Sequence, residues 1–113
     1  MDKIFERGML FDFYGELLTK HQQKIYSEAV FNDLSLAELS EEEGISRQGI
    51  HDLIKRCDKL LMGYEEKLNL IKKFQLIKQE ASKLDDIIDS IDSIDENAKD
   101  QLKAGLTKII EEL

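Results

Sequence analysis

The chain of 113 residues contains no Pro, no Trp and a single Cys. Without Pro, no residue forces a helix to kink or end, and the abundance of Leu, Lys, Glu and Ile favours long uninterrupted helices. Because Cys57 has no second cysteine to pair with, no disulfide can form within the chain. We expect its thiol to lie in the interior or in a helix interface as a small apolar side chain.

Long apolar runs are missing as well. No stretch approaches the roughly 20 apolar residues that are needed to span a bilayer. The first residues carry Asp2, Glu6 and Asp12 among their apolar neighbours, which does not resemble a signal peptide. The sequence therefore predicts a cytoplasmic protein with no membrane span.

Motifs for catalysis and for cofactor binding do not occur in the sequence. His21 and His51 have no HExxH or CxxC pattern beside them, so neither has the neighbours of a zinc ligand. There is no Ser-His-Asp arrangement and no Gly-rich phosphate loop. We interpret the chain as a non-enzymatic protein without metal, cofactor or small-molecule substrate.

Charge is acidic overall but unevenly placed. The formal net charge of −8 argues against an indiscriminate nucleic-acid binder, which would usually be basic. Residues 1–75 carry a net charge of −3 and residues 76–113 a net charge of −5. Within 46–59, however, four cations outnumber Asp52 and Asp58. A basic segment in an acidic protein points to local contact with an anion.

The segment from Leu36 to Arg56, LAELSEEEGISRQGIHDLIKR, has the spacing of a helix-turn-helix. Ser40 is small where two helices would cross, and Gly44 permits the positive φ of the turn between them. Ile45 is expected to plug the core. The buried stripes on either side of the turn comprise Leu36, Leu39, Ile50, Leu53 and Ile54.

In this motif the second helix lies in the DNA major groove, with its N-terminal residues at the base edges. The predicted DNA-binding residues are Ser46, Arg47, Gln48, His51, Lys55, Arg56 and Lys59. Bidentate geometry suits Arg47 to guanine and Gln48 to adenine, while the three last cations would contact phosphates. The alternative is that all seven are ordinary polar surface residues on a retained scaffold, and the acidic run 41–43 would repel phosphates.

Helical patterns cover the rest of the first 75 residues. A first helix is expected over Ile4–Leu18, followed by a capping box in which Thr19 pairs with Gln22 and opens a helix to Phe31. Ser35 caps the first helix of the helix-turn-helix. Ser46 caps the second, which is predicted to run to about Met62, where Gly63 offers a break.

From Leu70 onwards, apolar residues alternate spacings of four and three in a heptad-like seam. The seam comprises Leu70, Phe74, Ile77, Ala81, Leu84, Ile88 and Ile91. Residues 95–97 interrupt this rhythm, which resumes at Leu102, so the tail could fold back as a helical hairpin. It could equally pack on the N-terminal helix or on a second subunit, and we expect a homodimer.

An acidic row at helical spacing, formed by Asp85, Asp89, Asp92 and Glu96, accompanies the seam. It lacks the Gly-containing turn of a calcium loop, so we interpret it as a solvated face. A basic protein or an RNA-protein surface could dock there.

Residues Leu17–Lys67 resemble region 4 of sigma-70-type factors, through LTKHQQ entering a helix and then NDLSLAELSEEEGISRQGI. Over Ile4–Phe74 the chain is similar to the YlxM-like family of small bacterial helix-turn-helix proteins. This resemblance implies a DNA-binding role and a link to the signal recognition particle pathway, whose GTPase gene neighbours the family's genes. Glu43 and Gly49 depart from the sigma pattern, which more commonly has an apolar residue and Ala there.

The sequence thus predicts an all-α protein with a sigma-70 region 4-like helix-turn-helix, without a wing, and a long helical C-terminal extension. We expect a helix-turn-helix domain over 1–75 and a helical segment over 76–113. The predicted function is DNA-binding transcription regulation tied to the targeting pathway. The alternative is an interaction or assembly factor of that pathway, in which the acidic tail makes the functional contact.

Overall fold

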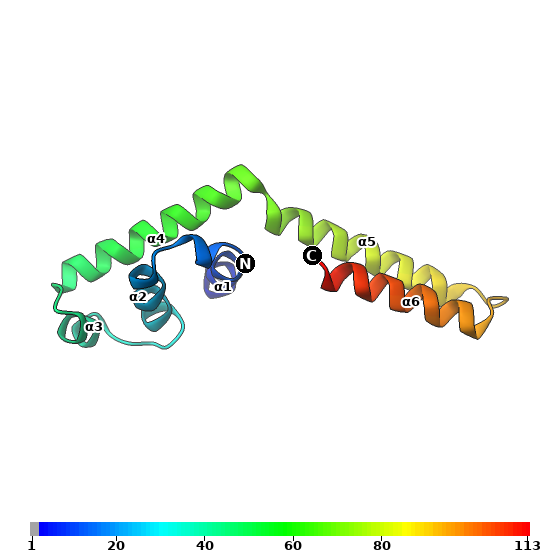
Figure 1. The fold of residues 1–113 in the computed structure, drawn as a ribbon, viewed down its shortest axis with the longest axis horizontal. Helices are drawn as coiled ribbons and strands as arrows, with labels where there is room; N and C mark the ends of the chain where they lie inside the picture. The colour runs from blue at the N-terminus through cyan, green and yellow to red at the C-terminus, as the bar shows by residue number, and fades with distance from the viewer. Residues whose placement is uncertain (1–2) are drawn as a thin grey trace. The chain divides into compact units, whose positions relative to one another are not determined.

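The computed structural model describes residues 3–113, which form helices and connecting turns with no strand among them. In chain order they are α1 (Lys3–Tyr14), the 3₁₀ turn η1 (Gly15–Leu17), α2 (Lys20–Val30), α3 (Leu36–Glu43), α4 (Arg47–Leu68), α5 (Leu70–Ser90) and α6 (Glu96–Glu111) (Figure 1). The predicted all-α fold is confirmed. The chain divides into two compact units, Met1–Ile71 and Lys72–Leu113.

In the first unit the long helix α4 runs along one side, and α1, α2 and α3 all pack against it (Figure 1). Its core has two clusters. The smaller one joins Ile25, Leu39 and Ile50, all fully buried, and it holds the helix-turn-helix to α2. The larger one fastens α1 and α2 to the middle of α4, through Leu10, Tyr14, Leu18, Tyr26, Val30, Cys57, Leu61 and Ile71.

The predicted capping residues are confirmed. Thr19 and Ser35 each form a complete capping box, with Gln22 and Glu38 as the third residues of the helices they open. The hydroxyl of Ser46 accepts the backbone N–H of Gly49 at 3.0 Å. Each of these caps satisfies an N–H that the first turn of a helix would otherwise leave without a partner.

The turn of the helix-turn-helix is built as the sequence indicates. Gly44 adopts a left-handed conformation with φ +67°, which favours glycine. Ser40 does more than allow close approach, since its hydroxyl donates to the carbonyl oxygen of Ile45 at 2.5 Å. Leu39 and Ile50 are fully buried, whereas Leu36 is 37% exposed and lies at the edge of the stripe.

The predicted break at Gly63 is wrong, because α4 continues through it to Leu68. The helix ends instead at Asn69, whose left-handed conformation has φ +56°. Packing explains the difference, since Leu61 is fully buried and Tyr64 packs on the larger cluster, so both sides of Gly63 are fixed as helix. A glycine inside a helix costs about 1 kcal/mol, which such burial easily exceeds.

Polar contacts join α1 and α2 to the middle of α4, across 51 and 32 residues of sequence. The Arg7 guanidinium donates to both carboxylate oxygens of Asp58, from Nε at 3.1 Å and from Nη2 at 2.6 Å, and the Tyr26 hydroxyl donates to the same carboxylate at 2.5 Å. Burial and this hydrogen bond raise the pKa of Tyr26, and the hydrogen bond to Asp58 raises the pKa of Arg7. This cluster fixes the start of α1 against the middle of α4.

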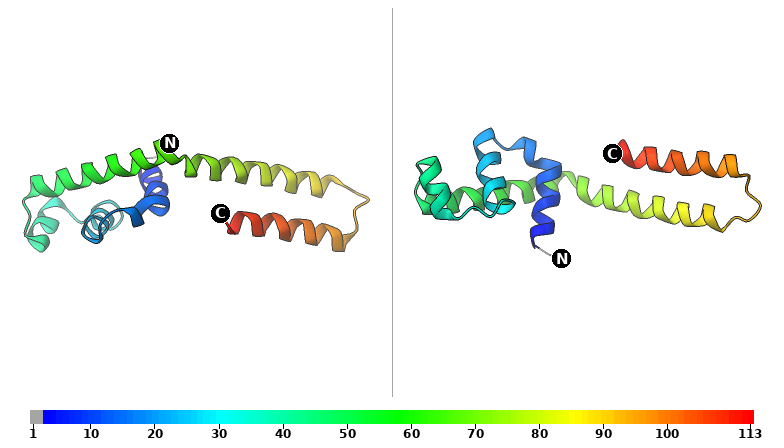
Figure 2. Two further views of the ribbon diagram at one scale, coloured as in Figure 1. Left: turned by 45° about the horizontal axis from the view of Figure 1, so that its top comes forward. Right: turned by 90° about the horizontal axis from the view of Figure 1, so that it is seen from below.

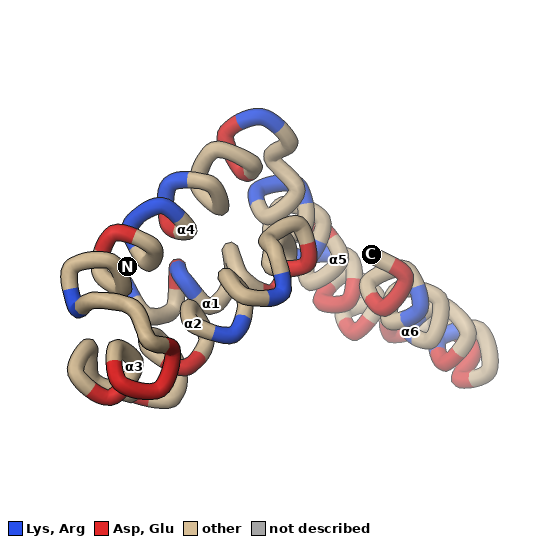
Figure 3. The backbone as a smooth tube through the Cα atoms, turned by 60° about the vertical axis from the view of Figure 1, so that its left-hand side comes forward, with Lys and Arg blue, Asp and Glu red and all other residues tan. Residues whose placement is uncertain are grey.

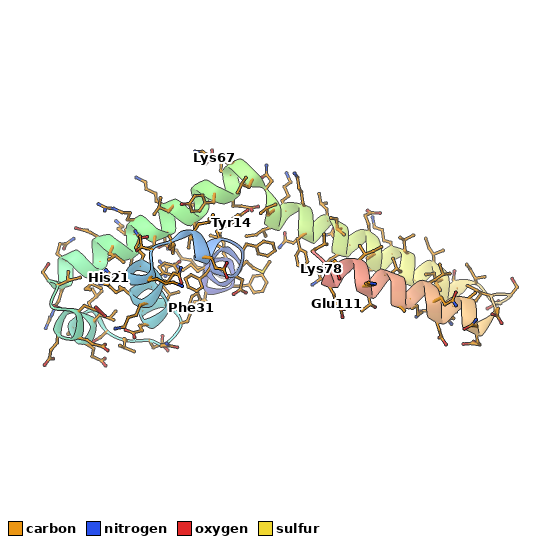
Figure 4. The ribbon with its side chains drawn as sticks, in the orientation of Figure 1. Tyr14, His21, Phe31, Lys67, Lys78 and Glu111 are labelled. Carbon is orange, nitrogen blue, oxygen red and sulfur yellow. The ribbon has the colours of Figure 1, made fainter. Side chains whose placement is uncertain are left out.

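A second polar cluster caps the start of α5. The Tyr14 hydroxyl donates to the Glu65 carboxylate at 2.5 Å and accepts the N–H of Leu70 at 3.2 Å, while the same carboxylate accepts the N–H of Ile71 at 3.0 Å. Figure 4 labels Tyr14 on the side of α4 that faces α1. Burial and then the bond to Glu65 raise the pKa of Tyr14. Two N–H groups of the first turn of α5 are thus satisfied by side chains of α1 and α4.

In the second unit, α5 and α6 run antiparallel as a hairpin (Figures 1 and 2). The predicted fold-back of the tail is therefore present. Lys103 on α6 binds Asp89 at 2.6 Å and Asp85 at 3.6 Å, and Lys99 binds Asp89 at 3.5 Å. These bonds lower the pKa of Asp89 and raise that of Lys103. Two members of the predicted acidic row are therefore not simply solvated but form ion pairs within the hairpin.

Candidate nucleic-acid interface

The structure gathers the predicted DNA-binding residues on the outer surface of α4. Ser46 is the N-cap of that helix, and the six other residues are exposed along its first thirteen positions. They form two groups. The first group, Arg47, Gln48 and His51, lies in the first turns of α4, and the second group, Lys55, Arg56 and Lys59, lies farther along. About 18 Å of helix separates Arg47 from Lys59. On the opposite face of the same stretch, Ile50 is fully buried in the core of the helix-turn-helix. This packing directs the predicted DNA-binding residues outwards.

One row of this surface is free of acidic residues. Arg47, His51, Lys55 and Lys59 follow one another at intervals of four, so each lies about 6 Å farther along the helix and slightly rotated from the last. Figure 3 shows Lys and Arg recurring along α4 with acidic residues between them, and a run of acidic residues on α3. Three cations of this row, Arg47, Lys55 and Lys59, therefore lie along one edge of α4 in an acidic protein.

Next to this row, Asp52 contacts two of the predicted DNA-binding residues, Gln48 and His51. The Gln48 side-chain amide donates to the Asp52 carboxylate at 2.9 Å, and the His51 ring lies 3.8 Å from the same oxygen. To read an adenine, Gln48 would have to exchange this intrahelical bond for a base contact. The spacing of four between Gln48 and Asp52 was visible in the sequence and could have indicated this contact.

The second group of cations surrounds a surface hollow of about 480 Å³ on α4. Its lining residues are Lys55, Arg56, Asp58, Lys59 and Met62. Asp58 is held by Arg7 and Tyr26, so its negative charge is largely satisfied on the inner side. The three cations remain available to an anion that approaches from outside.

The acidic run 41–43 was expected to repel phosphates, but Glu43, its last member, is held by side chains of α2. Its carboxylate binds Lys24 at 2.9 Å and lies 3.5 Å from the His21 ring, both on α2. The bond to Lys24 lowers the pKa of Glu43 and raises the pKa of Lys24. Glu43 therefore links α3 to α2, a role that no local sequence signal indicated, and only Glu41 and Glu42 remain as exposed acids of that run.

Gly49 also has a structural explanation. A Cβ atom at this position would lie 2.7 Å from Cγ2 of Ile45 and 3.1 Å from the hydroxyl of Ser46. Real Cβ atoms essentially never come as close to another atom as the first of these distances, and the second is tighter than nine in ten real Cβ contacts. Glycine at this position thus leaves room for the side chain of Ile45, which packs against the core of the helix-turn-helix. Its presence is explained by packing and is no argument against DNA binding.

Cys57, in the middle of α4, is fully buried, as expected. Burial is the main cause that raises the pKa of its thiol to about 11, which keeps the group protonated and unreactive. Among residues 3–113, no three His, Cys, Asp or Glu side chains gather as a metal site would require. Within the same residues, no helix is both long enough and apolar enough to cross a membrane.

Comparison with known proteins agrees with this geometry. Residues 1–103 match the model of the UPF0122 family, described as "Putative helix-turn-helix protein, YlxM / p13 like". The UPF0122 protein of Acetivibrio thermocellus is 44% identical over 99% of this chain and 93% of its own length. That of Clostridium perfringens is 42% identical over 97% of this chain and 98% of its own length. With a helix-turn-helix in its first unit and relatives that match nearly end to end, the chain belongs to the UPF0122 family of helix-turn-helix proteins.

Proposed function

We propose that this protein is a DNA-binding regulator that places the N-terminal half of α4 in the major groove. The observation that carries the proposal is the acid-free row of Arg47, His51, Lys55 and Lys59, exposed on the outer face of the second helix of the motif. This is the helix that reads base edges in helix-turn-helix proteins.

Within this proposal the two groups of side chains have different roles. Arg47 and Gln48, in the first turn, would contact base edges, with His51 one turn farther on. Lys55, Arg56 and Lys59 would contact phosphates, as would the backbone N–H groups at the start of α4 beside Ser46. The hydroxyl of Ser46 is already engaged as the cap, so its contribution is to hold those N–H groups in place.

The net charge of −8 sets the character of the binding. Attraction to phosphates comes only from the local row of cations on α4, while Glu41, Glu42 and the net negative charge of the protein repel phosphates. With three or four phosphates neutralised, the logarithm of the binding constant should fall with the logarithm of salt at a slope of about −3. We therefore expect a moderate, salt-sensitive affinity that depends on sequence.

The experiment is a selection of bound fragments from random DNA, at low and at physiological salt, followed by affinity measurements on the selected site. Arg47→Ala should weaken the selected site more than an unrelated one, so that sequence preference relaxes. Lys55→Ala should weaken both to the same extent and make the salt slope shallower by about 1.

Lys67→Ala is the matched control. Lys67 is exposed in the last turn of the same helix, about 30 Å from Arg47, and the substitution removes the same charge. Figure 4 labels it at the far end of α4. Binding by this variant should equal that of the wild type. If no DNA is bound even at low salt, the proposal fails.

The alternative, an interaction or assembly factor that contacts its partner through the acidic tail, has weaker support. Asp85 and Asp89 already bind Lys99 and Lys103 within the hairpin, which leaves less negative charge for a partner. The link to the signal recognition particle pathway remains a prediction of the sequence resemblance. A regulator of this kind would act in the cytoplasm.

A further inference from the structure

The hairpin has two unlike flanks. On one flank lie the ion pairs of Lys103 with Asp85 and Asp89. The other flank is an open groove of about 380 Å³ that carries no charged residue in its lining. We name this groove the apolar face, and its lining residues are Leu84, Ile88, Gln101, Leu102, Gly105, Leu106 and Ile109.

The second unit buries little apolar surface by itself. Within Lys72–Leu113, only Ile88 is buried, with 7% of its surface exposed. Leu84 and Leu102 are each 49% exposed and Ile109 is 56% exposed. Other large apolar side chains are also exposed: the helical repeat places Leu76, Ile77, Ile87 and Ile91 beside this groove, and Leu113 follows the end of α6. A two-helix hairpin with one buried residue lacks the core that an independent unit needs.

The exposed area fits a second copy of the same surface. A large aliphatic side chain presents on the order of 120 Å² of apolar surface, so eight half-exposed ones present about 480 Å². A specific interface of standard size buries about 800 Å² on each partner, of which a little more than half is apolar, or about 450 Å². The two areas agree without any contribution from the first unit.

We propose that two copies of the chain associate through their apolar faces, so that the two hairpins form a four-helix bundle. Such an interface is self-complementary, as a twofold dimer requires, because each apolar face meets its own equivalent. The charges of the hairpin that pair with each other lie on the opposite flank. Two acidic chains can therefore meet at this face without opposing carboxylates in the groove lining.

Gly105 supports close packing of a neighbouring helix at this face. It lies in the middle of α6, where glycine is unfavourable, and a Cβ atom there would meet nothing within 4 Å inside the chain. No contact in the monomer therefore requires a glycine at this position. A helix that crosses over it from a second copy would benefit from the missing side chain.

The test is sedimentation of the full chain over a wide concentration range, with circular dichroism of each variant. The wild type should sediment at twice 13.1 kDa. Leu84→Asp and Ile109→Asp should each sediment as monomers with unchanged helix content, because both side chains are half exposed in the monomer. Ser82→Asp and Thr107→Asp are the controls, since they add the same charge to the other flank, and both should remain dimers.

A wild type that stays monomeric at every concentration overturns the proposal, and so does a dimer that survives both apolar-face variants. Loss of the dimer in the two controls as well would show a general effect of charge and would overturn it too. If an Asp variant unfolds, Leu84→Ala and Ile109→Ala decide, since each should raise the dissociation constant at least tenfold. The association requires no DNA, so its result is independent of the proposed DNA binding.

Discussion

Two glycines in α4 should respond in opposite ways to the same substitution. Replacing an internal helical Gly by Ala gains about 0.5–1 kcal/mol of stability where the new methyl group has space. At Gly63 nothing lies within 4 Å of the added Cβ, so Gly63→Ala should raise the free energy of unfolding by that amount. At Gly49 the added Cβ would lie 2.7 Å from Cγ2 of Ile45, a branched side chain fixed close to the backbone.

Overpacking of this kind costs about 1–3 kcal/mol, which exceeds the gain in helix propensity. We therefore expect Gly49→Ala to lower the free energy of unfolding by about 1 kcal/mol. The two variants should differ by about 2 kcal/mol. Urea unfolding followed by circular dichroism measures the difference, provided that both variants keep the urea dependence of the wild type. If Gly49→Ala stabilises as much as Gly63→Ala, the contact with Ile45 does not constrain this position.

Two further predictions concern the ion pairs of the first unit. The lowered pKa of Glu43 means that its bond to Lys24 stabilises the fold above the ordinary Glu pKa of about 4.3, and that this stability is lost as the pH falls through the lowered value. Glu43→Gln should therefore be less stable than the wild type at pH 7 and equal to it near pH 2, and an equal deficit at both values would contradict the assignment. Asp58→Asn leaves the part-buried Arg7 guanidinium without its counter-charge, so urea unfolding should show a loss of about 2 kcal/mol, between the costs of exposed and buried pairs. A loss below 0.5 kcal/mol would show that the pair contributes no more than a surface contact.

Local signals in the sequence were sufficient for the helix-turn-helix. Ser35, Gly44 and Ser46 act through bonds or backbone angles within five residues, so their roles follow from spacing alone. The end of α4 could not be predicted in the same way. Gly63 is a local signal for a break, but burial on both sides of it depends on α1, which lies far away in the sequence.

The environment of the candidate site was less predictable than its residues. Spacing identified the cations of α4, but it could not show that Glu43 binds Lys24 on α2 or that Asp58 binds Arg7 on α1. Both contacts depend on how helices cross, and these crossings change the net charge that an approaching anion would meet. The ion pair of Asp89 with Lys103 could not be predicted for the same reason.

The long separation of contacts in the first unit has a consequence for synthesis on the ribosome. Ile25, Leu39 and Ile50 can meet as soon as the first turns of α4 have emerged, so the helix-turn-helix can assemble early. Helix α1 must wait, because Arg7 and Tyr14 find their partners only 51 residues later, at Asp58 and Glu65. Until then α1 can pack only on α2 and the residues just after it, through contacts such as those of Phe11 with Tyr26 and Phe31, because Cys57 and Leu61 of the same core are not yet made. The nascent chain therefore carries a first helix whose core is incomplete for much of the time that the first unit takes to be made.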